Sequence, residues 1–170
     1  AVTMHSDGDL GEVLEIPAGG SAHPMDAAAL AANDNKIHMR GKELFKIAVR
    51  TMEESLHQAL EEAGVAASEV QLLIPHQANL RIIEAVRTRL KFPADRVVLN
   101  IDRYGNTSSA SIPISLDEVV REGRLKPGDL VAFVAFGGGA TWGASVVRWT
   151  QPTPLAHEPA LAGAEARRPS

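Results

Sequence analysis

The sequence contains no cysteine, and this absence excludes several kinds of chemistry from the chain. Without cysteine there is no disulfide framework, no thiolate zinc site and no cysteine nucleophile. Basic residues are not in excess either, because the formal net charge of −4 excludes a strongly basic nucleic-acid-binding protein. No stretch approaches the roughly 18 consecutive apolar residues of a membrane-spanning helix. The first residues also lack the basic and apolar regions of a secretory signal.

What the sequence does contain is enough apolar side chain for a core. The chain has 170 residues, of which 45% are hydrophobic, and this size fits one domain or one half of a larger two-part fold. We expect three segments. Residues 1–40 are a lead-in with one strand at 11–16 and loops, residues 41–150 are the folded domain, and residues 151–170 are a mobile tail rich in alanine and proline.

Hydrophobic periodicity within residues 41–150 predicts alternating helices and strands. Apolar residues at three- and four-residue steps indicate a helix that begins at Gly41 and ends at Gly64. The other predicted elements are a buried strand at 70–75, a helix at 80–90, a short strand at 97–99, a helix at 108–122, and strands at 130–136 and 144–149. This order is typical of an α/β fold. The short glycine-rich link predicts that the last two strands are antiparallel.

Two polar residues follow predicted strands, where α/β folds build their sites. His76 comes directly after the strand at 70–75, and an imidazole there can form hydrogen bonds or move a proton near neutral pH. A loop histidine bonded to nearby backbone is an equally good interpretation. Asn106 follows the strand at 97–99, and its amide can polarise a carbonyl. On local evidence alone, a helix-capping role is favoured for Asn106.

Glycines and basic residues give two further candidate features. The run Gly137-Gly138-Gly139 can supply backbone amides to an oxyanion hole, although a tight hairpin is the commoner role of such a run. Basic residues gather at 36–50 and 81–91, which suits an anionic partner, but solvated helix faces are the usual outcome. The six histidines are scattered without metal-ligand spacing, so we predict no metal site.

Three motifs taken together are far more specific than any of these residues alone. Residues 74–83, with Pro75-His76-Gln77-Ala78-Asn79-Leu80-Arg81, resemble the histidine motif of β-ketoacyl-acyl-carrier-protein synthase III. Tyr104-Gly105-Asn106-Thr107-Ser108 resembles its asparagine motif, and Phe136-Gly137-Gly138-Gly139-Ala140-Thr141-Trp142-Gly143 resembles its C-terminal glycine loop. Residues 41–49 resemble the helix before the histidine motif. The resemblance runs from about His5 to Trp149 and matches only the C-terminal half of that family.

The resemblance implies a fold and a reaction. The fold is the C-terminal half of a thiolase-like α/β architecture, a mixed sheet with helices on both faces. The reaction is the decarboxylative Claisen condensation that initiates fatty acid synthesis. A cysteine thiolate takes the acyl group of an acyl-CoA primer, and the carbanion formed from malonyl-acyl-carrier protein attacks it. The family's catalytic cysteine lies in its N-terminal half, so we expect this chain alone to be inactive in acyl transfer.

The resemblance also assigns roles to residues of this chain. His76 and Asn106 match the catalytic pair that hydrogen-bonds the malonyl thioester oxygen, and Gly138 supplies a backbone amide near the acyl-enzyme oxygen. The residues expected to bind the carrier protein are Gln77, Ala78, Asn79, Leu80, Arg81 and Lys46. Gly41 and Phe45 match positions beside the family's pantetheine tunnel.

The partners implied are an acyl carrier protein, an acyl-CoA and an N-terminal half that carries the cysteine. The complete enzyme is expected to be a cytoplasmic homodimer that needs no cofactor, nucleic acid or membrane. Two alternatives stay open. One is a thiolase-fold acyltransferase of polyketide or other secondary metabolism, and the other is a catalytically inactive half that binds carrier protein or CoA.

Overall fold

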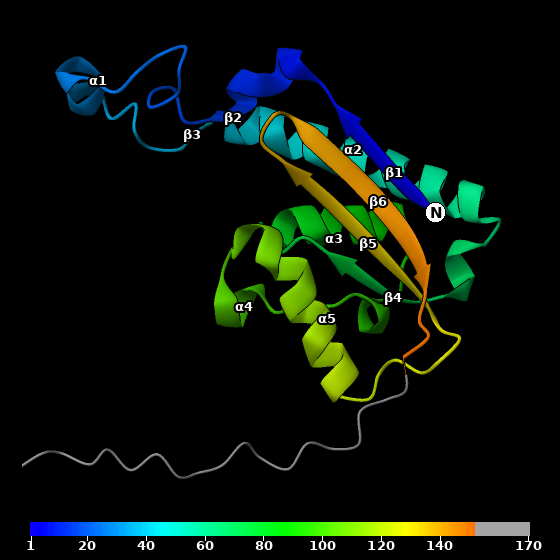
Figure 1. The fold of residues 1–170 in the computed structure, drawn as a ribbon. Coiled ribbons are helices and arrows are strands. Elements are labelled where there is room, and N and C mark those ends of the chain that lie inside the picture. Colours follow the sequence, from blue (N-terminus) through cyan, green and yellow to red (C-terminus); the bar gives the residue numbers. More distant parts are fainter. Residues whose placement is uncertain (152–170) are drawn as a thin grey trace, which may run out of the picture.

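The computed structural model describes residues 1–151. Its strands and helices are, in chain order, β1 (Val2–Ser6), β2 (Leu14–Glu15), α1 (Ala27–Ala32), β3 (His38–Met39), α2 (Gly41–Ala63), β4 (Val70–Pro75), α3 (Leu80–Arg89), α4 (Ile101–Tyr104), α5 (Ser111–Arg121), β5 (Leu130–Gly137) and β6 (Thr141–Arg148). Figure 1 shows most of these elements packed around one twisted sheet, with α1 beyond its end. The mobile tail predicted at 151–170 lies outside the described residues, apart from Gln151. Within the described part, every helix is too short or too polar to cross a membrane.

The main sheet has four strands in the order β1-β6-β5-β4. β4 runs parallel to β5, whereas β5 and β6 are antiparallel, as are β6 and β1. The predicted antiparallel pairing of the last two strands is therefore confirmed. A parallel pair needs a crossover connection, and the chain between β4 and β5 supplies one through α3 and α5. The mixed sheet brings the ends of β4 and β5 to the same edge.

Helices pack on both faces of the sheet. On one face, α2 buries its apolar stripe against β5 and β6 and contacts α3. The α2 helix ends where predicted, at Gly64, whose φ of 65° gives the left-handed conformation that glycine adopts without strain. On the other face, α5 packs against β4 through a smaller apolar cluster that contains Ile74 and Val119. The predicted α/β sheet with helices on both faces is thus confirmed.

One part of the sheet has no helix over it. Side chains of β1 alternate, so that Thr3 is buried toward α2 while Val2 and Met4 are 63% and 82% exposed on the opposite face. Figure 1 shows β1 and β6 lying in front of α2, with α5 beside rather than over them. Phe133 of β5 is half-buried on the same side. An apolar sheet face without cover is a surface that a partner element normally buries.

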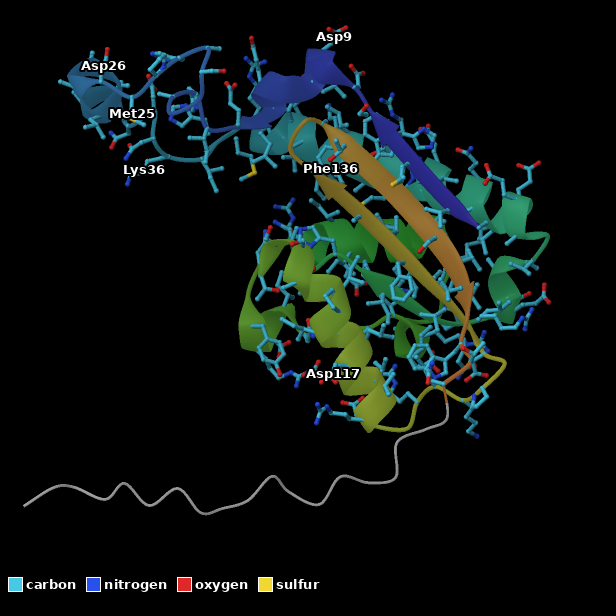
Figure 2. The ribbon with its side chains drawn as sticks, in the orientation of Figure 1. Asp9, Met25, Asp26, Lys36, Asp117 and Phe136 are labelled. Atoms are coloured by element: carbon cyan, nitrogen blue, oxygen red, sulfur yellow. The ribbon has the colours of Figure 1, made fainter. Side chains whose placement is uncertain are left out.

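The first 40 residues differ from the prediction. The strand predicted at 11–16 is a 3₁₀ turn (Gly8–Val13) followed by the two-residue strand β2, because the Asp7 side chain accepts a hydrogen bond from the amide of Asp9 and starts the turn. The structure adds β1, α1 and β3, none of which was predicted. Figure 2 shows Met25 and Lys36 of this segment lying beyond the end of the sheet.

Two other predicted elements are shorter than expected. The strand predicted at 97–99 makes a single parallel bridge, between Val97 and Leu73. Its backbone nevertheless follows β4, since the amide of Val98 donates to the carbonyl of Leu73 at 2.9 Å. The helix predicted at 108–122 begins with a 3₁₀ turn (Ser108–Ala110) and becomes α-helical only at Ser111.

Candidate active site

The candidate site lies at the edge of the sheet where β4 and β5 end. His76 is the first residue after β4, and its amide donates to the carbonyl of Val134 at 2.8 Å, which extends the parallel pairing by one step. Gly138 is the first residue after β5. A groove of about 1320 Å³ opens here between β2, β3, α2, α3 and the Asn106 loop, and we call it the main groove.

The main groove gathers the residues that the sequence singled out. All of the predicted site residues except Gln77 and Leu80 line it, namely Gly41, Phe45, Lys46, His76, Ala78, Asn79, Arg81, Asn106 and Gly138. They come from four separate stretches of the chain. The fold therefore brings together residues that are as far as 97 positions apart (from Gly41 to Gly138).

His76 is held by one side-chain contact. Its Nδ1 lies 2.6 Å from Oγ of Ser111 at the start of α5. Burial lowers the pKa of His76 below its ordinary value of 6.5, because desolvation disfavours the charged ring. The imidazole is therefore neutral near pH 7, with one nitrogen able to donate and the other able to accept a hydrogen bond.

Asn106 is placed by a tight loop. Gly105 precedes it with a φ of 66°, and the Asn106 Oδ1 atom accepts a hydrogen bond from the amide of Ser108 at 2.9 Å. This contact is an Asx turn one residue before the 3₁₀ turn, whose N-cap is Thr107, so the helix-capping role that local sequence evidence favoured is wrong in detail. It engages only the oxygen of the amide, and within residues 1–151 no hydrogen bond engages its Nδ2 atom. The exposed Asn106 side chain also lines the main groove, so a turn-forming role and a role in the site are both open to this residue.

The glycine run closes the hairpin between β5 and β6. Gly137 and Gly138 line the main groove, and a Cβ atom on Gly138 would lie 3.4 Å from the carbonyl oxygen of Leu14. Gly139 has a φ of 138°, which L side chains rarely adopt. The run thus forms a tight hairpin and also brings its backbone to the groove without side chains in the way.

Basic and aromatic side chains stand at the outer part of the main groove. The guanidinium of Arg81 lies over the Phe45 ring, 5.8 Å from its centroid, and the side chain is otherwise exposed. Lys46 is exposed on the next position of α2. Asn79 caps α3 by accepting a hydrogen bond from the amide of Arg81 at 2.9 Å. These contacts hold two positive charges beside the groove.

The structure corrects the prediction for Gln77, whose side chain was expected to contact a carrier protein. Gln77 is completely buried, and its amide donates to the carbonyls of Pro75 and Val98 and accepts from the amide of Asn100. A side chain in that position cannot reach a docked protein. Leu80, in contrast, is 49% exposed on α3 just outside the groove lining.

Two of the four basic residues at 81–91 form ion pairs within the chain. Arg87 pairs with Glu84 at 2.8 Å, and Arg89 pairs with Glu53 of α2. These pairs match the interpretation of residues 87–89 as a solvated helix face better than that of a docking surface.

Sequence reasoning missed two polar residues of α5 behind the site, Ser111 and Glu118. Ser111 contacts His76, and the Glu118 carboxylate of α5 accepts hydrogen bonds from Asn100, Arg103 and Tyr104. These contacts tie the Asn106 loop to α5. The only available signal was the position of Tyr104 in the asparagine motif, since nothing in the sequence shows which helical residue it meets.

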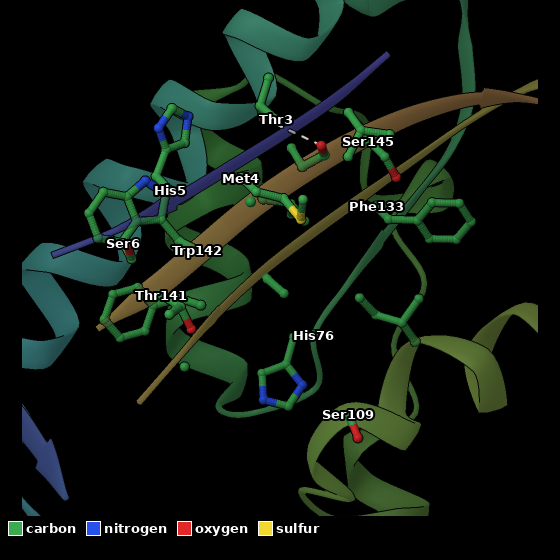
Figure 3. A pocket seen from close by; sticks show the side chains of 18 of the residues that line it. Thr3, Met4, His5, Ser6, His76, Ser109, Phe133, Thr141, Trp142 and Ser145 are labelled. Carbon is green, nitrogen blue, oxygen red and sulfur yellow. Dashed lines mark hydrogen bonds between the residues drawn. The ribbon is translucent and has the colours of Figure 1, made fainter. Parts of the chain in front are cut away.

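A second hollow lies on the uncovered face of the sheet. This sheet-face hollow, of about 710 Å³, is lined by β1, β6 and β5 and by His76 and Ser109. Figure 3 shows Met4, Phe133 and Ser145 along its strands, with the His76 ring at its lower end beside Ser109. His76 therefore stands where the main groove meets the uncovered face.

Comparison with known proteins identifies the family. The family model described as 3-oxoacyl-(acyl-carrier-protein) synthase III C terminal matches residues 60–149, more than half of the chain. The chain belongs to the 3-oxoacyl-acyl-carrier-protein synthase III family. Its fold is the C-terminal half of the thiolase-like architecture of those enzymes.

Individual members of the synthase III family show how much of the protein is represented. A β-ketoacyl-acyl-carrier-protein synthase III of Desulfitobacterium hafniense is 52% identical over 145 residues, which cover 85% of this chain and 44% of that protein. The crystal structure of the Aquifex aeolicus enzyme matches with 47% identity and a TM-score of 0.75, over 88% of this chain and 44% of the other. The chain spans about half the length of the relatives that it matches.

Proposed function

We propose that this chain supplies the decarboxylation half of a synthase III active site. In the complete enzyme, an acyl-CoA primer and malonyl-acyl-carrier protein are joined to a 3-oxoacyl product, which begins fatty acid synthesis. The proposal rests on three residues that line the main groove together, His76, Asn106 and Gly138. They come from three motifs that are distant in the sequence.

The proposed chemistry follows from the hydrogen-bond donors in the main groove. Loss of carbon dioxide from a malonyl thioester leaves the electrons of the broken C–C bond as an enolate, with negative charge on the thioester oxygen. Neutral His76 and the amide of Asn106 each offer an N–H group to that oxygen. Fixed donors at a developing oxyanion stabilise the transition state more than the substrate. The carbanion then attacks the acyl carbon of the cysteine thioester, and the cysteine leaves as a thiolate when its C–S bond breaks. The Gly138 amide donates a hydrogen bond to the acyl-enzyme oxygen.

The cysteine must come from outside this chain, which contains none. We propose that a cysteine-bearing N-terminal half covers the uncovered sheet face. Val2 and Met4 are exposed there, and the sheet-face hollow leads to His76, so a half seated on it meets the catalytic histidine. The relatives are about twice as long as the part that this chain matches, which leaves room for such a half.

We propose that an acyl carrier protein docks at the outer part of the main groove. Carrier proteins are acidic, and the exposed Arg81 and Lys46 supply opposite charge beside the groove. The phosphopantetheine arm would then enter past Gly41 and Phe45 toward His76. In line with the family resemblance, we expect the complete enzyme to be a homodimer.

A polyketide role is the second candidate. The priming β-ketosynthase of the R1128 polyketide biosynthetic pathway matches with 30% identity and a TM-score of 0.74, over 89% of this chain. The greater identity to enzymes named synthase III favours the fatty acid role.

The deciding experiment removes the two donors one at a time in the full-length, cysteine-bearing enzyme. His76→Ala and Asn106→Ala should each slow malonyl-carrier-protein decarboxylation by about 10²- to 10³-fold, as loss of an oxyanion donor does elsewhere. Binding of the carrier protein should be unchanged. His57→Ala, which removes an exposed histidine on α2, is the matched control. Decarboxylation at the wild-type rate in both variants would refute the assignment.

A further inference from the structure

We propose that Ser111 is a positioning residue that holds the neutral His76 ring with its proton on Nε2. This inference rests on the contacts that Ser111 makes with His76 and Gln77. Only its catalytic consequence depends on the proposed function. Ser111 belongs to none of the three motifs that the sequence singled out.

The Ser111 hydroxyl has two contacts, one with the part-buried His76 ring and one with the buried backbone amide of Gln77. Its oxygen lies 2.6 Å from Nδ1 of His76 and accepts a hydrogen bond from the backbone amide of Gln77 at 3.2 Å. Ser111 is 2% exposed, and Gln77 is fully buried. Because Ser111 is almost completely buried, its hydroxyl hydrogen needs an acceptor within the protein.

The position of the proton follows from counting donors. A hydroxyl has one hydrogen to donate, and the Gln77 amide already fills one of its acceptor positions. Among residues 1–151, Nδ1 of His76 is the only acceptor in reach of that hydrogen. If Nδ1 carried the ring proton instead, two N–H groups would point at the Ser111 oxygen, and its own hydrogen would be buried without a partner, which is costly. The satisfied arrangement has Ser111 donating to Nδ1, which leaves the proton on Nε2.

Ser111 is itself held from two sides. The Gln77 side chain donates hydrogen bonds to the carbonyls of Pro75 and Val98. These bonds fix the position of Gln77, whose backbone amide donates to Ser111. One turn along α5, the Ser115 hydroxyl donates to the Ser111 carbonyl at 2.8 Å. The buried Gln77 thus has a structural task in place of the docking contact expected from its motif.

The catalytic consequence concerns the free ring nitrogen. With Nδ1 engaged by Ser111, Nε2 is the nitrogen without a hydrogen-bond partner among the described residues, and His76 lines the main groove. An N–H at Nε2 is a donor that an enolate oxygen can use, whereas a bare Nε2 would repel it. Burial lowers the pKa of His76 and keeps the ring neutral, so the choice of tautomer decides whether the donor exists.

The test reads the tautomer directly. In the full-length protein labelled with ¹⁵N-histidine, two-bond ¹H–¹⁵N correlation spectra at pH 8 distinguish a protonated from a bare ring nitrogen, and the His76 signals are assigned by their loss in His76→Ala. We expect wild-type His76 to be fixed with its proton on Nε2. Ser111→Ala should give exchange between the two tautomers. Ser111→Thr, which keeps the hydroxyl, should restore the wild-type spectrum.

Kinetics supply the second readout. Ser111→Ala should lower kcat for decarboxylation by about 5- to 30-fold, the effect of one lost hydrogen bond, and should leave KM for the malonyl substrate near the wild-type value. Ser55→Ala is the matched control, because it removes another buried serine hydroxyl, on α2, that makes no hydrogen bond within the described residues and does not touch His76. It should leave the tautomer unchanged.

Two results would overturn the inference. One is a wild-type ring with its proton on Nδ1, and the other is a ring fixed on Nε2 in Ser111→Ala. If Ser111→Ala fails to fold, the wild-type and Ser111→Thr spectra still decide the matter. The spectra do not depend on catalysis, so a fixed Nε2 proton combined with normal decarboxylation in His76→Ala would refute the proposed function and leave this inference standing.

Discussion

The contact between α5 and the Asn106 loop offers a quantitative test, through the substitution Glu118→Gln. One oxygen of the Glu118 carboxylate accepts from Asn100 Nδ2 at 2.8 Å, and the other accepts from the Tyr104 hydroxyl at 2.7 Å. Arg103 pairs with both oxygens. Glutamine keeps the shape and helix propensity of glutamate, but it has one acceptor oxygen and no charge.

The expected loss of stability comes mainly from the buried partner. Asn100 is 2% exposed, so water cannot replace its bond, whereas the exposed Arg103 and Tyr104 can turn to solvent. A hydrogen bond to a charged group contributes about 1.5–3 kcal/mol and a neutral one about 1 kcal/mol. We therefore expect Glu118→Gln to lower the free energy of unfolding at pH 7 by about 1–2 kcal/mol.

The pH dependence of this loss has a definite sign. Burial opposes ionisation of Glu118, but hydrogen bonds from Asn100, Tyr104 and Arg103 outweigh it and lower the pKa of the carboxyl below its ordinary 4.5. A lowered folded-state pKa means that the stabilisation is fully present above 4.5 and is lost as the pH falls through the folded value. The difference between wild type and Glu118→Gln should therefore shrink on acidification.

Urea unfolding of the full-length protein at pH 7 and at decreasing pH measures both effects. Asp117→Asn is the matched control, since Asp117 is the next residue of α5 and its pair with Arg121 is exposed, and such pairs contribute about 0.3–0.5 kcal/mol. Figure 2 shows Asp117 on the outer side of α5. A Glu118→Gln variant no less stable than Asp117→Asn would refute the reasoning.

Three further expectations can be checked separately. Arg81→Glu should weaken carrier-protein binding in surface plasmon resonance, mainly through slower association that depends on salt, whereas Arg50→Glu, an exposed charge reversal outside the main groove, should not. Met4→Lys should prevent the cysteine-bearing half from covering the sheet face, which co-purification of separately tagged halves would show as lost association. Gly143→Ala should destabilise the fold in thermal unfolding by about 1–3 kcal/mol, because its Cβ would lie 2.5 Å from the Thr3 carbonyl oxygen in the neighbouring strand.

Hydrophobic periodicity predicted the elements with a long apolar face, and it did not predict those whose buried residues are few or polar. The α2 helix carries a long apolar stripe and a glycine at its end, and both are local signals. Strand β1 gives the opposite signal, because its polar Thr3 is buried while Val2 and Met4 are exposed. Thr3 tolerates burial since its hydroxyl donates to the carbonyl of Ser55 on α2, a partner that lies 52 residues away. Apolar alternation cannot reveal a strand whose buried side chain is satisfied by a distant element.

The same limit applies to the candidate site. The motifs singled out His76 and Asn106, both of which line the main groove, and His76 lies there because it directly follows β4. They did not reveal Ser111, which reaches His76 from 35 positions further along the chain. The resemblance also implied carrier-protein binding by Gln77, because the motif does not show the carbonyls of Pro75 and Val98 that its buried side chain meets.

Asn106 shows why local evidence alone could not choose between a structural and a catalytic role. The Asx-turn bond uses Oδ1 and orders the turn before α5, whereas the proposed catalysis uses the N–H groups of the same amide. The two uses support each other, because a side chain fixed through its oxygen presents its nitrogen without the entropy cost of being ordered when substrate binds. A substitution that keeps the Asx-turn bond and removes the donor separates them. In Asn106→Asp the carboxylate can still accept from the Ser108 amide, but it offers the enolate a negative charge, so we expect decarboxylation to fall at least as far as in Asn106→Ala while the fold is retained.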